Sequence, residues 1–99
     1  MIMLRDKILI KANDDNIREL VKNMTDEDLN CIDTTNVTNM SSLFCYESFN
    51  GDISRWNVSN VTNMESMFDH SRFNQDISHW DVIKVKNMSY MFEYSIFKI

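Results

Sequence analysis

Apolar and polar positions along most of this chain repeat with a period of 24 residues. Residues 36–59 align with residues 60–83 without a gap, and 14 of these 24 positions are identical. A truncated unit follows at 84–99, and a degenerate half-unit precedes the full units at 28–35. A period of this length is typical of one turn of a solenoid whose coil contains a short strand. We therefore predict a repeat solenoid over residues 28–99.

Each unit contains an apolar pattern with the spacing of a short parallel strand. The pattern consists of Ile53, Trp56 and Val58, and it returns at Ile77, Trp80 and Val82. It predicts strands near 56–58 and 80–82, stacked so that equivalent side chains form columns through the core.

A second pattern in the unit has the spacing of one face of a helix. It consists of Val61, Met64, Met67 and Phe68, with Asn60 or Thr62 placed to cap a short helix or 3₁₀ segment. The two patterns together predict an α/β solenoid of the leucine-rich-repeat-like class, with Trp columns, Phe columns and methionines in its core. The methionines expected in the core are Met40, Met64, Met67, Met88 and Met91.

The first 27 residues lack the repeat and have their own pattern. Residues 8–10 form a short β-like run, and the helical stripe that follows consists of Ile17, Leu20, Val21 and Met24. Asp14 or Asp15 is expected to cap this helix. We predict that residues 1–27 form an N-terminal cap, a short strand plus a helix, that shields one end of the core. Because the sequence stops part-way through a coil, we expect a fragment of a longer array or an end covered by another molecule.

Composition and charge exclude several classes of function. The formal charge is -5 and the basic residues do not cluster, so we expect no nucleic-acid partner. No uncharged stretch approaches the roughly 18 residues of a membrane helix, so we expect no membrane insertion. The sequence contains no nucleophile–base pair, metal cluster or phosphate loop, and we therefore expect neither an enzyme nor a cofactor.

The repeat also resembles a known family. The block FNGDISRWNVSNVTNMESMF at 49–68, which returns as FNQDISHWDVIKVKNMSYMF at 73–92, is similar to the repeat of BspA-like leucine-rich-repeat proteins of bacterial surfaces. This resemblance implies a non-catalytic module, commonly part of a lipoprotein or wall-anchored protein, that acts in adhesion or protein binding at the cell surface or outside the cell. Since the chain shows no signal peptide, a fragment or a truncated cytoplasmic copy is the alternative.

Polar residues recur in register as well. Asp28, Asp52 and Asp76 form one ladder, which could hold a cation such as calcium but is better suited to Asx turns. A second ladder, expected to bond backbone groups at coil corners, consists of Asn36, Asn39, Asn60, Asn63 and Asn87. Several of these asparagines also match the N-glycosylation triplet, which we interpret as a by-product of the repeat.

The cysteines and histidines lack the spacing of a reactive or metal site. Cys31 and Cys45 occupy different repeat positions, so we expect free thiols, with a disulfide across a coil as the alternative. His70 and His79 have no partner at ligand spacing and are expected on the surface.

Positions that change between copies on a constant scaffold are the candidates for partner recognition. We predict a protein-binding face, for instance for a host or matrix protein, made of Arg55, Asn57, His79 and Asp81. A variable return loop at 47–48 and 70–72 lies beside it. The alternative is a structural spacer or self-assembling unit that stacks end to end through an uncapped end. That end-on interface consists of Met88, Met91, Phe92 and Phe97.

Overall fold

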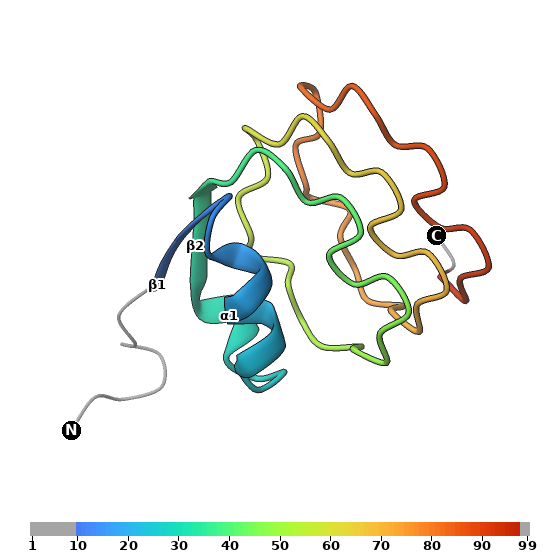
Figure 1. Cartoon of the computed structure of the whole chain (residues 1–99), viewed down its shortest axis with the longest axis horizontal. Coiled ribbons are helices and arrows are strands. Elements are labelled where there is room, and N and C mark those ends of the chain that lie inside the picture. Colours follow the sequence, from blue (N-terminus) through green and yellow to red (C-terminus); the bar gives the residue numbers. More distant parts are fainter. Residues whose placement is uncertain (1–9, 98–99) are drawn as a thin grey trace.

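The regular secondary structure of the protein is concentrated near its N-terminus. The computed structural model describes residues 10–97. Its elements are strand β1 (Ile10–Asn13), helix α1 (Ile17–Asn23), the 3₁₀ turn η2 (Leu29–Cys31) and strand β2 (Ile32–Asn36). The following residues form successive loops that lie side by side without regular helix or strand (Figure 1).

The N-terminal elements pack as the apolar stripe predicts. Ile17 of α1 is fully buried, and Leu20, Val21 and Met24 pack against the core cluster. Strand β1 pairs in parallel with β2, with Ile10 opposite Ile32. The β-like run predicted at 8–10 is therefore described only from Ile10 onward, since residues 8 and 9 lie outside the described range.

The prediction that Asp14 or Asp15 caps helix α1 is wrong. The N-cap of α1 is Asn16, which makes no side-chain capping hydrogen bond. The Asp14 carboxylate instead accepts hydrogen bonds from the backbone N–H groups of Thr38, at 2.8 Å, and Asn39, at 3.0 Å. These two amides begin the repeats and have no earlier repeat to bond, so the carboxylate serves them in place of a backbone carbonyl.

The rest of the chain forms three windings, which we define as residues 36–59, 60–83 and 84–97. The first winding is bonded to the second by the N–H groups of Met40, Ser42, Phe44 and Tyr46, which donate to the carbonyls of Asn63, Glu65, Met67 and Asp69 at 2.8–2.9 Å. The same four bonds recur between the second and third windings, one repeat later along the chain, for example from Met64 N to Asn87 O. Alternate amides therefore hold the windings together in a parallel arrangement.

The predicted helix at 61–68 is not formed. Its amides at 64, 66 and 68 bond the next winding, so they cannot make the i to i−4 bonds of a helix. The segment is instead a series of tight turns, in which Ser66 has a φ of 57° and His70 a φ of 55°. The other windings repeat this left-handed backbone at the equivalent residues, Ser42, Tyr46, Tyr90 and Tyr94.

The strands predicted near 56–58 and 80–82 are also absent from the described chain. Their backbone groups are satisfied locally, since Trp56 N donates to Ile53 O and Val61 N to Val58 O. The inward apolar spacing is nevertheless correct, because Ile53, Trp56 and Val58 are all buried. In this protein, the inward apolar spacing is therefore produced by successive turns and not by a strand.

Phe rings form two columns through the windings, as predicted. Phe44 stacks on Phe68 at 5.6 Å between ring centroids, and Phe68 stacks on Phe92 at 5.5 Å. Phe73 lies 6.0 Å from both Phe49 and Phe97. These columns fix the lateral register of the three windings.

The tryptophans pack differently from the expected Trp column. Trp56 lies 5.8 Å from Phe44, and Trp80 lies 6.4 Å from Phe68, so each indole pairs with a Phe of its own winding. Each indole also bonds the preceding part of the chain, since Trp56 Nε1 donates to Leu29 O and Trp80 Nε1 to Ile53 O.

Four of the five methionines expected in the core are buried, namely Met40, Met64, Met67 and Met91. Met88 is 43% exposed, so its assignment to the core is wrong. It is the counterpart of Met64, which the third winding covers, whereas no described segment covers Met88.

Candidate functional site

The four residues of the predicted binding face are all exposed. Asn57 and Asp81 use a side-chain oxygen to accept the backbone N–H two residues later, from Ser59 and Ile83 respectively. Arg55 and His79 donate no side-chain hydrogen bond to any described residue. The side-chain N–H groups of Arg55 and His79 are therefore available to a partner, while the side-chain oxygens of Asn57 and Asp81 form turns.

The segments that carry these residues are neighbours. Asn74 N donates to Asn50 Oδ1 at 2.7 Å, and Trp80 Nε1 donates to Ile53 O at 3.2 Å. These bonds tie 50–57 to 74–81, which run side by side in Figure 1. Arg55 also borders a hollow of about 290 Å³ that it shares with Asn57 and β2. The structure therefore places the predicted face on adjacent windings.

The four residues of the predicted end-on interface converge on one hollow. Its volume is about 600 Å³, and its remaining lining includes Ile77, Trp80 and Val82. Met91 is buried, Phe92 and Phe97 are half-buried, and Met88 is exposed. The end of the core is thus open to solvent over the third winding.

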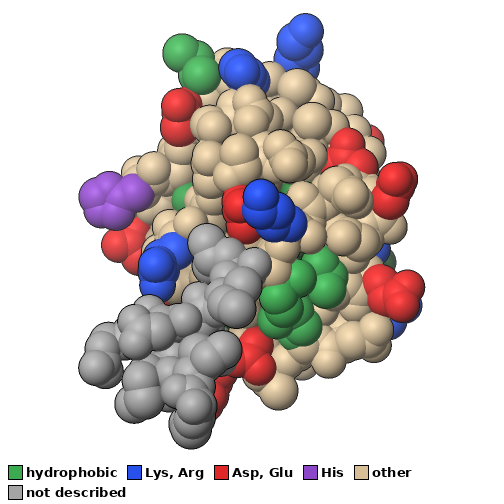
Figure 2. Space-filling view, turned by 90° about the vertical axis from the view of Figure 1, so that its left-hand side faces the viewer, with side chains coloured by type: hydrophobic (Ala, Val, Ile, Leu, Met, Phe, Trp, Pro, Cys, Tyr) green, Lys and Arg blue, Asp and Glu red, His purple; other side chains and the backbone are tan. Residues whose placement is uncertain are grey.

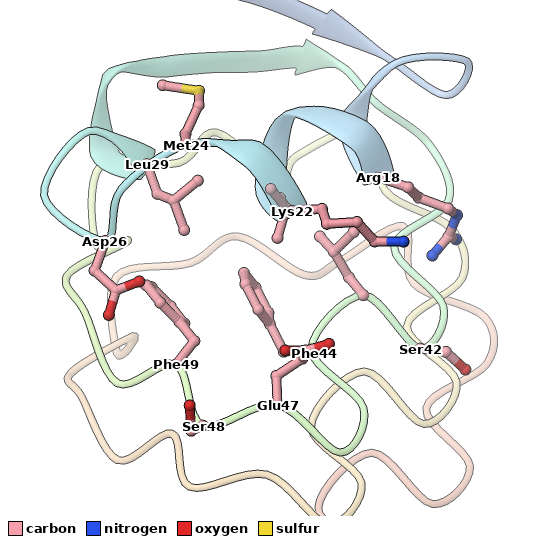
Figure 3. Close-up of a pocket in the computed structure, with 12 residues that line it drawn as sticks. Arg18, Lys22, Met24, Asp26, Leu29, Ser42, Phe44, Glu47, Ser48 and Phe49 are labelled. Carbon is pink, nitrogen blue, oxygen red and sulfur yellow. The ribbon is translucent and has the colours of Figure 1, made fainter.

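A third hollow, beneath α1, has no counterpart in the sequence predictions (Figure 3). It encloses about 350 Å³ between the helix and residues 42–49. Phe44, Phe49 and Leu29 form apolar walls, while Lys22 and Glu47 bring opposite charges to it. Arg18 lines it too, and its guanidinium donates to Ser41 Oγ at 3.3 Å. The only sequence signal was the i, i+4 spacing of Arg18 and Lys22 on one helix.

An exposed column of rings was also missed. The His70 ring lies 4.3 Å from that of Tyr46 and 4.6 Å from that of Tyr94. His70 Nδ1 is 2.7 Å from Asp69 Oδ1, which orients the imidazole. All three residues occupy the same position of the repeat. A side chain with a ring at this position in every unit was the feature of the sequence that could have predicted the column.

Two members of the Asp ladder, Asp52 and Asp76, form turns, as predicted. Asp52 accepts the N–H of Ser54 and Asp76 that of Ser78, both at 2.9 Å. Hydrogen bonds from these serines hold the pKa of both carboxyls below the ordinary value of 3.8. The described residues contain no group of three or more His, Cys, Asp and Glu side chains placed to hold a metal ion.

The asparagines behave in the same way. Asn39, Asn63 and Asn87 each accept the N–H of the residue two positions later, at 2.9 Å. Asn60 Nδ2 donates to Thr35 O at 2.8 Å, which links a corner to the preceding segment. The ladder therefore satisfies backbone groups that the turns leave open.

Both cysteines are free thiols and half-buried, so the alternative of a disulfide between them is wrong for this structure. Burial, together with the charges of Asp69 and Glu47, raises the pKa of the Cys45 thiol above its ordinary value. A raised pKa lowers the thiolate fraction, which opposes a role as nucleophile.

Charged side chains of either sign do not form a single patch on the face that carries the N-terminal elements. Figure 2 shows acidic and basic side chains interspersed over that surface. Within the described range, no helix has the length and apolar character required to cross a membrane.

Comparison with known proteins identifies a family that the chain resembles. A family model described as "Mycoplasma protein of unknown function, DUF285" matches residues 15–97. The matched range includes α1 and all three windings, and it begins before the boundary predicted at residue 28. No curated protein and no solved structure matches the chain.

Proposed function

The chain belongs to the family described as Mycoplasma protein of unknown function, DUF285, and we propose that it is a non-catalytic, protein-binding repeat module. We place it with BspA-like leucine-rich-repeat surface proteins, as a solenoid of 24-residue coils. Two features support the solenoid: the same amides bond each winding to the next, and Phe44, Phe68 and Phe92 stack in one column.

A contrast between buried and exposed positions of the windings carries the proposal. The inward positions keep the same residue from one winding to the next, as Trp56 and Trp80 do. The exposed positions on either side of the tryptophan differ between windings, since Arg55 is matched by His79 and Asn57 by Asp81. A rigid scaffold with variable outward side chains is the arrangement that partner-binding repeat proteins use.

The chemistry of this face favours a protein partner that presents acceptors. Arg55 and His79 point donors outward from neighbouring windings, and neither donates a side-chain hydrogen bond to a described residue. Carboxylates and backbone carbonyls on an adhesion partner match such donors. The proposed setting is the cell surface, where protease treatment of intact cells should cleave the protein and leave cytoplasmic markers intact.

Binding to purified matrix proteins tests the lateral face. The chain is passed over immobilised fibronectin, laminin and collagen, and the double variant Arg55→Ala/His79→Ala is compared with Lys86→Ala, which removes an exposed cation outside the face and outside the variable return loop. We expect the double variant to lose at least about tenfold in affinity, the scale of a removed charge-assisted contact, and Lys86→Ala to bind normally. Equal affinities of the parent chain and both variants, or no binding of the parent chain to any of the three matrix proteins, would contradict the proposal.

A second candidate function, a structural unit that stacks end to end, is favoured by the open apolar end. Met88 is 43% exposed there, and a hollow of about 600 Å³ adjoins it. Exposed apolar patches of this kind usually mark interfaces. Sedimentation over a wide concentration range tests self-stacking, since a chain that stays monomeric throughout does not stack on itself.

A further inference from the structure

The only glycine of the sequence directly follows an asparagine, at Asn50–Gly51. An asparagine side chain can react with the backbone nitrogen of the next residue, because that nitrogen and Cγ close a five-membered ring. A Cβ on the next residue hinders the approach, and glycine has none. The repeat counterpart of this pair is Asn74–Gln75. Successive windings therefore carry a reactive pair and a hindered pair at the same position.

Neither reacting group of the pair is held in regular secondary structure. Asn50 is exposed, and residues 47–53 belong to no helix or strand of the described chain. The backbone N–H of Gly51 donates no hydrogen bond to any residue in the range 10–97. A nitrogen bonded within a helix or sheet cannot turn toward the preceding side chain. The Gly51 nitrogen lacks this restraint and is available as a nucleophile.

The fold uses each member of the pair for a separate structural purpose. A Cβ at residue 51 would lie 2.7 Å from Cε1 of Phe49, so the packing favours glycine there. Asn50 Oδ1 accepts the backbone N–H of Asn74 at 2.7 Å, and Asn50 O accepts Nε2 of Gln75 at 3.1 Å. These two hydrogen bonds join the first winding to the second. The requirements of the junction thus place an asparagine directly before a glycine.

The bond from Asn74 also favours reaction at Asn50. When the Gly51 nitrogen attacks Cγ of Asn50, negative charge develops on Oδ1 in the tetrahedral intermediate. The N–H of Asn74 already points at this oxygen and stabilises the charge as an oxyanion donor does. The side-chain nitrogen that leaves donates no hydrogen bond to a residue in the described range, so it is free to take a proton from water.

We propose that Asn50–Gly51 is a self-modification site, at which Asn50 deamidates without an enzyme. The Gly51 nitrogen loses its proton to hydroxide and bonds to Asn50 Cγ. The Cγ–Nδ2 bond breaks and ammonia leaves, which gives a cyclic succinimide. Water then opens the ring at one of its two C–N bonds, to yield aspartate or isoaspartate at residue 50. The net change consumes water and releases ammonia, and no atom is oxidised or reduced.

The two products affect the junction between windings differently. Aspartate keeps an oxygen that can accept the N–H of Asn74, and its main effect is one additional negative charge. Isoaspartate continues the main chain through Cγ and adds a methylene group beside Gly51, where the packing leaves no room for a Cβ. It should therefore loosen the contact between 50–57 and 74–81. The inference depends on the pair and its contacts alone and is independent of the proposed binding function.

The folded 99-residue chain is incubated at mildly alkaline pH, which promotes loss of the Gly51 proton, and its fragments are followed by mass spectrometry. Asn74, followed by Gln75, is the internal control. We expect residue 50 to convert at least about tenfold faster than residue 74, which corresponds to a barrier difference of about 1.4 kcal/mol. Both aspartate and isoaspartate should form. Equal rates at the two positions overturn the proposal.

A parallel incubation in guanidinium chloride tests whether the fold leaves the pair reactive. The folded chain should convert at a rate within about tenfold of the unfolded chain. A folded chain that stays unmodified while the unfolded chain converts overturns the proposal. Asn50→Gln retains an amide but requires a six-membered ring, which closes more slowly, and it should stay unmodified at residue 50. Conversion of this variant at the parent rate would also contradict the mechanism.

Stability measurements on the separated products test the effect on the junction. The isoaspartate form, isolated by ion exchange, should unfold at a lower urea concentration than the parent chain. Asn50→Asp reproduces the charge of the other product without the added methylene group, and it should retain the parent midpoint. An isoaspartate form as stable as Asn50→Asp would overturn the effect assigned to the junction.

Discussion

The indole nitrogen of Trp56 donates a 2.7 Å hydrogen bond to the backbone carbonyl of Leu29, which lies 27 residues earlier in the chain. The bond joins the first winding to η2 and, through it, to β2 and the N-terminal elements. Trp80 repeats the contact with Ile53 at 3.2 Å. One side chain per unit thus combines apolar burial with a specific bond between successive parts of the fold.

The two tryptophans should contribute unequally to stability. Trp56 is 3% exposed, whereas Trp80 is half-buried at the open hollow. We expect Trp56→Phe to lower the free energy of unfolding by about 2–3 kcal/mol, from the lost hydrogen bond and the lost ring volume. Trp80→Phe should cost about 1 kcal/mol because less packing is removed. Urea unfolding of both variants measures the difference, and equal losses would count against the fold.

Asp14 should act as a cap on the first winding. Asp14→Ala leaves the N–H groups of Thr38 and Asn39 without their acceptor, and we expect a loss of about 1 kcal/mol in unfolding free energy, similar to the loss of a helix N-cap. Asp14→Asn keeps an oxygen acceptor and should lose less. Replacement of Asp15, whose neighbouring carboxylate accepts neither of these two bonds, is the control and should change stability little.

The same carboxylate should make stability depend on pH. Desolvation acts to raise the pKa of Asp14, but the hydrogen bonds from Thr38 and Asn39 outweigh it and hold the pKa below 3.8. Asp14 therefore binds the proton more weakly in the folded state than in the unfolded state. The stabilising effect of its carboxylate is complete above the pKa that Asp14 has in the unfolded state, and it is lost as the pH falls through the pKa of the folded state. Between about pH 5 and pH 3, Asp14→Asn should lose less stability than the parent chain. Parallel urea midpoints across this range would refute the assignment.

Gly51 should resist enlargement although its repeat counterpart is Gln75. A Cβ at residue 51 would lie 2.7 Å from Cε1 of Phe49 and 3.2 Å from the carbonyl oxygen of Asp26. We expect Gly51→Ala to lower the free energy of unfolding by about 1–3 kcal/mol through overpacking. Gln75→Ala should change it little. Thermal unfolding of the two variants provides the comparison, and a Gly51→Ala protein as stable as the parent would contradict the predicted clash.

The left-handed backbone at Ser66 should tolerate glycine better than a branched residue. Its φ is 57°, a region that costs a side chain roughly 1–2 kcal/mol. We expect Ser66→Gly to be neutral or stabilising by about 0.5 kcal/mol, because glycine adopts this conformation without strain. Ser66→Val should destabilise the fold by more than 1 kcal/mol, since branched residues are outliers there. If valine were the better substitute, the turn would not have the backbone described.

Much of the candidate site followed from the repeat register alone. The exposure of Arg55 and His79, the convergence of Met91, Phe92 and Phe97, and the turns at the Asp and Asn ladders were predictable from the sequence. Each depends on which side chains fall in line after one period. The hollow beneath α1 could not be predicted in this way, because it depends on how a non-repeating helix is placed on residues 42–49.

The sequence by itself determined the period, the inward apolar positions and the local Asx turns, because these depend on side-chain chemistry at fixed spacing. Tertiary structure decided which backbone amides join the windings. The helical spacing of Val61, Met64 and Phe68 could not reveal this, since the positive φ of Ser66 turns alternate amides toward the neighbouring winding. The same contacts decided that Asp14 caps the repeats instead of α1, and that the third winding borders an apolar hollow.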